Sequence, residues 1–140
     1  MIDPFTISRK IDHTLLKPDA DIDNIRQLCQ EAIEHHFFSV CINSAWLKIA
    51  GEFLQDSSVK LCTVAGFPMG DSTTSSKLNE METSINNGAS EIDMVMNIGF
   101  FKNEKYNIVS DEIIRMVQNA HGKIIKIIIN NTIWNNFFWV

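Results

Sequence analysis

Five short apolar runs recur along the chain, and longer segments with helical periodicity separate them. The runs span residues 11–16, 39–42, 59–65, 91–97 and 123–129. Strands that alternate with helices are typical of repeated βαβ units, whose strands lie parallel in one sheet. The alternation therefore predicts an α/β fold, and it leaves two architectures open: a doubly wound sheet and part of a (β/α)8 barrel.

Between the runs, apolar residues recur at spacings of three and four, which is the pattern of an amphipathic helix. The stretch Asp19-Ala20-Asp21 offers an N-cap and acids for the start of the first of these segments, and Gly88 follows the end of the third. The segment 66–75 could hold a phosphate at a helix N-terminus, but it lacks a P-loop lysine, so a plain strand–turn–helix connection is favoured. The expected helices span residues 22–33, 44–54, 71–87 and 105–120.

The fourth run, residues 91–97, separates polar from apolar side chains. Successive strand residues point to opposite sides, so Asp93 shares a face with Asn97, and the other face is wholly apolar. Burying an unpaired carboxylate is costly, so we expect Asp93 to face a partner, either Lys126 on the adjacent strand or a substrate. A sheet covered by helices on both sides requires two apolar faces. The pattern therefore favours a barrel, whose interior admits polar groups.

Charge and composition exclude several classes of protein. A formal net charge of −5 at pH 7 provides no basic surface for nucleic acid or an anionic membrane. The apolar runs are far shorter than the ~20 residues of a transmembrane helix, and the N-terminus lacks the pattern of a secretory signal. Cys29, Cys41 and Cys62 form no CxxC pair, which favours reduced thiols in a cytoplasmic protein over disulfides or a zinc site. We therefore expect no metal and no cofactor.

The same runs carry the motifs of a known family. In chain order they read IDHTLLKPDA (11–20), SVCINSAWL (39–47), KLCTVAGFPMGDSTTSSK (60–77), NNGASEIDMVMNIG (86–99) and KIIKIII (123–129). Each motif alone is modest. Their order and spacing resemble the successive strand motifs of the deoxyribose-phosphate aldolases over residues 7–129. The resemblance implies an incomplete (β/α)8 TIM barrel that contains strands one to five with their helices.

The resemblance also implies an activity in the catabolism of deoxyribose phosphate. The family cleaves 2-deoxy-D-ribose 5-phosphate into D-glyceraldehyde 3-phosphate and acetaldehyde, and it works through a lysine Schiff base without a metal. The iminium accepts electrons while the carbon–carbon bond breaks. A small phosphosugar is thus the expected partner, and a homo-oligomer is a second expectation.

The family's site residues match four positions of this chain. By resemblance, Asp93 is the catalytic proton-relay aspartate, Asp12 lies near the substrate hydroxyls, and Cys41 is a thiol of the substrate pocket. By the same resemblance, Lys126 matches a pocket lysine on strand five but not the Schiff-base lysine. A substitute role as nucleophile is disfavoured, because a neighbouring carboxylate raises a lysine pKa, the wrong direction for a neutral amine. A purely structural ion pair between Asp93 and Lys126 is the alternative.

The last residues, 130–140, depart from the family pattern. They carry no charge, four asparagines and four aromatic residues. We therefore expect residues 1–129 to be the N-terminal portion of an aldolase barrel and residues 130–140 to be unrelated sequence. The family's Schiff-base lysine lies on strand six, and Lys126 is the last lysine here, so we expect a truncated chain that is inactive alone. The alternative is a non-enzymatic truncated barrel that acts as an interaction module or has no function.

Overall fold

The structure is a computed structural model, and it describes residues 3–129. A curved parallel sheet forms the centre of this part of the chain. Neighbouring strands pair in the order β1-β2-β3-β4-β5, so the order across the sheet is the order along the chain. A doubly wound sheet reverses its strand order at a switch point, whereas a (β/α)8 barrel does not. The fold is therefore the expected α/β segment of a barrel. The strands are β1 (Asp12–Leu15), β2 (Ser39–Ile42), β3 (Lys60–Ala65), β4 (Glu91–Val95) and β5 (Ile124–Ile128).

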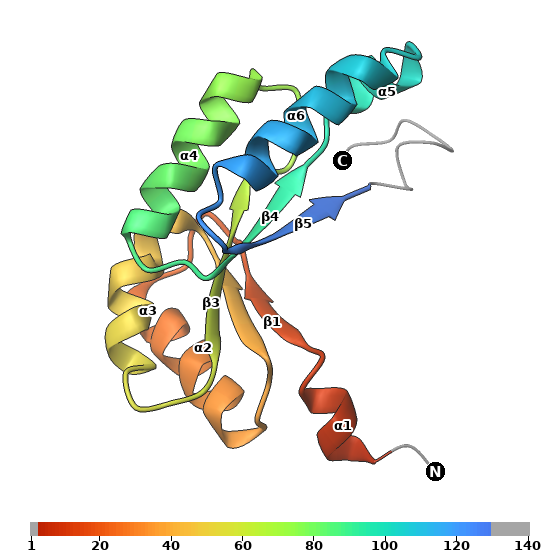
Figure 1. Ribbon diagram of the computed structural model, residues 1–140. Helices are drawn as coiled ribbons and strands as arrows, with labels where there is room; N and C mark the ends of the chain where they lie inside the picture. Colours follow the sequence, from red (N-terminus) through yellow and green to blue (C-terminus); the bar gives the residue numbers. More distant parts are fainter. Residues whose placement is uncertain (1–2, 130–140) are drawn as a thin grey trace.

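Helices cover one side of this sheet, and the other side forms the concave face (Figure 1). Within the expected capping stretch 19–21, Asp21 is the residue that caps α2, since its Oδ1 accepts a hydrogen bond from the Asn24 backbone N–H at 2.9 Å. Thr73 caps α4 by accepting from the Ser76 backbone N–H at 3.2 Å. The expected helix over 44–54 divides into a 3-10 turn, η1 (Ser44–Trp46), and α3 (Leu47–Phe53). The other covering helices are α2 (Ile22–Glu34), α4 (Thr74–Asn86) and α6 (Tyr106–Gln118).

Two five-residue helices were not predicted from the sequence: α1 (Pro4–Ser8) and α5 (Ile98–Lys102). Both are too short to show a repeated apolar face, and each begins at a polar side chain. Asn97, which was expected to end the fourth strand, instead caps α5 by accepting from the Phe100 backbone N–H at 3.0 Å. For this reason β4 ends at Val95, two residues earlier than expected.

The core lies between the sheet and its helices. Ile92 and Met94, on the predicted apolar face of β4, are fully buried. They belong to one cluster with Ile25 from α2, Met81 from α4 and Met116 from α6. Fully burying such a side chain contributes about 1.5–3 kcal/mol, so this cluster fixes which face of β4 points outward and hence that Asp93 points inward.

A buried ion pair fastens α4 and α6 to the end of β4. The Nζ of Lys77 lies 2.9 Å from Glu112 Oε2 and donates to the Val95 carbonyl at 2.8 Å, and both charged side chains are buried. A Cβ at Gly66 would lie 2.7 Å from Lys77 Cε, so glycine makes room for the lysine. This pair was not predicted from the sequence.

The turn after β3 packs closely against the end of β4. Gly70 has φ of +71°, and a Cβ there would lie 2.2 Å from the Met96 carbonyl oxygen. The Gly66 backbone N–H donates to Glu80 Oε2 at 2.9 Å, so α4 itself occupies this donor. The connection is thus a strand–turn–helix, as favoured from sequence. The expected atypical tail, residues 130–140, lies outside the described residues, and no helix within residues 3–129 is long and apolar enough to cross a membrane.

Candidate active site

The ammonium of Lys126 lies at the centre of a carboxylate cluster on the concave face. Its Nζ is 2.6 Å from Asp12 Oδ2, 3.0 Å from Asp93 Oδ1 and 3.1 Å from Glu91 Oε2. Asp93 stands directly opposite Lys126 in the pairing of β4 with β5. The structure therefore confirms the predicted contact between these two side chains.

Asp12 reaches the same ammonium from the far edge of the sheet. It belongs to β1 and Lys126 to β5, and these two strands do not pair with each other. The side chain of Lys126 thus spans the hollow of the curved sheet. Asp12 Oδ1 also accepts a hydrogen bond of 2.6 Å from Ser39 Oγ on the neighbouring strand, which holds the carboxylate in place.

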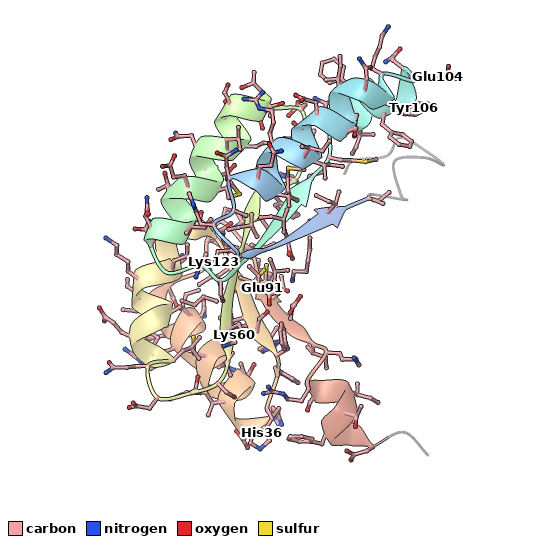
Figure 2. The ribbon with its side chains drawn as sticks, in the orientation of Figure 1. His36, Lys60, Glu91, Glu104, Tyr106 and Lys123 are labelled. Atoms are coloured by element: carbon pink, nitrogen blue, oxygen red, sulfur yellow. The ribbon has the colours of Figure 1, made fainter. Side chains whose placement is uncertain are left out.

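Glu91 is the member of the cluster that the sequence analysis missed. It is the first residue of β4, and Figure 2 labels it near the centre of the molecule, where that strand begins. Alternation along the strand predicted the direction of Asp93, and it applies equally to Glu91 two residues earlier. The inward direction of Glu91 could therefore have been predicted from the sequence. Only 2% of Glu91 is exposed, so its contact with Lys126 compensates an otherwise buried charge.

The cluster sets the charge states of its own members. Burial lowers the pKa of Lys126, but the contacts with Asp12 and Asp93 outweigh burial and hold that pKa well above its ordinary value. Burial raises the pKa of Asp12, yet the hydrogen bonds from Lys126 and Ser39 dominate and lower it. Lys126 is therefore an ammonium at neutral pH, which suits charge compensation and substrate contact but not nucleophilic attack.

Two cysteines complete this face. Cys41 on β2 lies with its Sγ 3.9 Å from Asp93 Oδ2, so the structure brings together all four residues predicted for the site. Cys62 on β3 stands opposite Cys41 in the strand pairing, and it was not predicted as part of the site. The neighbouring Cys41 thiol and burial raise the pKa of the Cys62 thiol, and the two sulfurs lie within 4.8 Å of each other in a buried part of the face.

The chain resembles aldolases both in sequence and in structure. A model of the DeoC/LacD family aldolases matches residues 6–136. A deoxyribose-phosphate aldolase from Bdellovibrio bacteriovorus is 51% identical over 129 residues, which cover 92% of this chain and 59% of that protein. One from Coprothermobacter proteolyticus is 48% identical over 87% of this chain and 56% of that protein. The chain thus spans less than two thirds of the length of these relatives.

Solved structures agree with the sequence comparison. A tetrameric deoxyribose phosphate aldolase from Aeropyrum pernix matches with a TM-score of 0.85 at 29% identity, over 95% of this chain and 56% of that one. The aldolase QR15 matches with a TM-score of 0.84 at 32% identity, over 93% of this chain and 57% of that one. These matches confirm that the five-stranded sheet has the architecture of an aldolase barrel segment.

Removing the Lys126 ammonium should destabilise the fold. Lys126→Met leaves Asp12, Asp93 and Glu91 without their shared counter-charge, and breaking a fully buried pair typically costs about 3–5 kcal/mol. Because the Lys126 side chain is 34% exposed, we expect a loss of about 2–4 kcal/mol in the free energy of unfolding, measured by urea denaturation. Lys123→Met, at an exposed lysine just before β5, is the matched control and should change it by less than about 0.5 kcal/mol. Equal losses in both variants would contradict the central role of Lys126.

The stabilising effect of Lys126 should depend on pH. The folded-state pKa of Asp12 lies below its ordinary value of 3.8, so this stabilisation is present above pH 3.8 and is lost as the pH falls through the folded-state pKa. The folded-state pKa of Lys126 lies above 10.5, so its contribution is complete below pH 10.5 and is lost as the pH rises through the folded-state pKa. The stability difference between the wild type and Lys126→Met should therefore be largest near neutral pH and shrink in strong acid and in strong alkali. A difference that grows in acid would disprove the assignment.

Proposed function

Because the chain belongs to the DeoC/LacD aldolase family, we propose that it supplies strands one to five of a deoxyribose-phosphate aldolase active site. The reaction is cleavage of 2-deoxy-D-ribose 5-phosphate into D-glyceraldehyde 3-phosphate and acetaldehyde. The observation that carries the proposal is the inward-facing cluster of Asp12, Asp93 and Lys126 on a sheet with the strand order of a barrel. The identity of 51% to a named deoxyribose-phosphate aldolase supports the same reaction.

In the proposed reaction, a neutral lysine attacks the substrate carbonyl, and the resulting iminium accepts the electron pair of the breaking carbon–carbon bond. Proton transfer must accompany these steps, and Asp93 has a suitable position for it. Its side chain is 18% exposed and touches Lys126 at 3.0 Å, so it can exchange a proton with a substrate while a fixed positive charge balances it. In this proposal, Asp12 and Lys126 contact substrate hydroxyls from the opposite edge strands.

Neither Lys126 nor Lys77, two lysines that form ion pairs within residues 3–129, suits the role of the attacking amine. Lys126 is held as an ammonium by three carboxylates, and Lys77 is locked against Glu112 on the helix side of the sheet. Neither meets the requirement of a neutral, accessible amine. We therefore propose that the described part of the chain provides proton transfer and substrate contacts, and that it does not provide the Schiff-base lysine.

This proposal predicts that the 140-residue chain does not form a covalent imine with the substrate. Incubation with 2-deoxy-D-ribose 5-phosphate and borohydride reduces any imine to a stable secondary amine, and intact-mass spectrometry detects the adduct. We expect the unmodified mass. The Bdellovibrio relative, treated in parallel, is the positive control for the trapping chemistry. A stoichiometric adduct on Lys126 would overturn the assignment of this lysine as a non-nucleophilic contact residue.

A chimera tests the role of Asp93. Residues 1–129 fused to the matching C-terminal part of the Bdellovibrio relative should cleave the substrate, and Asp93→Asn should lower its turnover by about 10²- to 10⁴-fold, because general acid–base help is lost. Asp56→Asn, at an exposed aspartate after α3, is the control and should leave turnover unchanged. If Asp93→Asn kept turnover within about twofold while the fold was destabilised, the structural ion-pair interpretation would hold instead.

We also propose that the isolated chain self-associates through its edge strands. Within residues 3–129, β1 and β5 each pair on one side only, and an edge strand with unpaired N–H and C=O groups is a template for another chain. Ile124, the first residue of β5, and Ile129, directly after its last residue, are 51% and 60% exposed. In such an assembly the concave face, which carries the carboxylates around Lys126, would contact a second copy of the chain. The chain would then act as the interaction module that is the alternative to an enzyme.

Light scattering after size exclusion measures this association. We expect a mass above that of the 15.9 kDa monomer and expect Ile124→Lys to shift the population toward the monomer. Ile114→Lys, at a comparably exposed position on α6, is the matched control and should not shift it. A monomer whose β1 and β5 amides are both strongly protected from hydrogen exchange would refute edge-strand association.

A further inference from the structure

Three potential metal ligands converge from neighbouring strands of the concave face. The Cys41 and Cys62 sulfurs and a carboxylate oxygen of Asp93 all lie within 4.8 Å of one another. The residues come from β2, β3 and β4, so they are far apart in sequence and close only because the strands pair. This explains why the absence of a CxxC pair led the sequence analysis to expect no metal.

The distances suit a single tetrahedral ion. Zinc binds thiolate at about 2.3 Å and carboxylate at about 2.0–2.2 Å, so two of its ligands lie roughly 3.5–3.8 Å apart. Cys41 Sγ and Asp93 Oδ2 are 3.9 Å apart, which already fits. With a limit of 4.8 Å for the other separations, side-chain shifts of about 1 Å close the site, and a water would complete the coordination.

The surroundings favour a cation. Asp12, Glu91 and Asp93 bring three negative charges against the one positive charge of Lys126, so the formal charge of the cluster is −2. Asp93 Oδ1 lies at ion-pair distance from Lys126 but, within the described residues, is buried and accepts no hydrogen bond. Lys126 keeps Asp12 and Glu91 when Asp93 turns, so the carboxylate is available to a ligand.

We propose that Cys41, Cys62 and Asp93 form a binding site for one thiophilic divalent cation, such as Zn²⁺. The ion forms bonds to both sulfurs and to one carboxylate oxygen, and the two thiol protons leave to solvent. Entry is from the side of Asp93, which is 18% exposed, because both cysteines are buried. Binding would occupy Asp93 and so inhibit proton transfer. Only this last consequence rests on the proposed function.

Cadmium provides a direct probe, since its bonds to thiolates absorb in the near ultraviolet. Titration of the reduced 140-residue chain with Cd²⁺ should show one equivalent bound with a thiolate-to-cadmium band, and Mg²⁺ should neither bind nor compete. Cys41→Ala and Cys62→Ala should each weaken the affinity by at least about tenfold. Cys29→Ala removes the third buried thiol, which lies in α2 outside the cluster, and should leave the affinity unchanged.

A second measurement needs no substitution, so it stands even if a variant fails to fold. Bound Cd²⁺ should slow the alkylation of Cys41 and Cys62 in the unaltered chain, with Cys29 as the internal standard, as read by peptide mass mapping. Absence of Cd²⁺ binding, an unchanged band in Cys62→Ala, or equal protection of Cys29 would each overturn the proposal. Neither readout depends on turnover, so a failure of the aldolase chimera would leave the result intact.

Discussion

The side chain of Lys126 ties the two edges of the sheet together. Its ammonium contacts Asp12 on β1 at 2.6 Å while its backbone pairs with Asp93 on β4, so one residue links the first strand to the last described one. Three carboxylates gathered without this charge would repel one another and meet a steep desolvation cost. The inward curvature of the sheet and the polarity of its hollow are therefore two aspects of the same interaction.

A second lysine performs a related task on the opposite side of β4. Lys77 reaches from α4 to the Val95 carbonyl and to Glu112 on α6, while Lys126 contacts Asp93 from the concave side. The strand that carries the proposed proton-transfer residue is thus held by a charged group on each face. Such double anchoring fixes the backbone of β4 that carries Asp93, as a preorganised site requires.

The sequence was informative wherever a local pattern governed the outcome. Alternation along residues 91–97 predicted that Asp93 faces inward, toward Lys126 or a substrate, and the acidic stretch 19–21 predicted where a helix begins. The same alternation could have predicted that Glu91 faces inward. The pair between Lys77 and Glu112 could not be predicted in this way, because its partners sit on two helices that only tertiary packing brings together. The short helices α1 and α5 lack a periodic face, and the reach of Lys126 to Asp12 depends on the curvature of the whole sheet.

The strand order has a consequence for how the chain folds during its synthesis. Each strand pairs with the one before it, so a nascent chain can add every new βα unit to an edge that already exists, and most pairings close short loops. The contact between Lys126 and Asp12 is different, because it joins residues 114 positions apart. Until residue 126 leaves the ribosome, the growing sheet exposes Asp12, Glu91 and Asp93 without their shared ammonium. The charge that draws the two edges together thus arrives after all three carboxylates that it contacts.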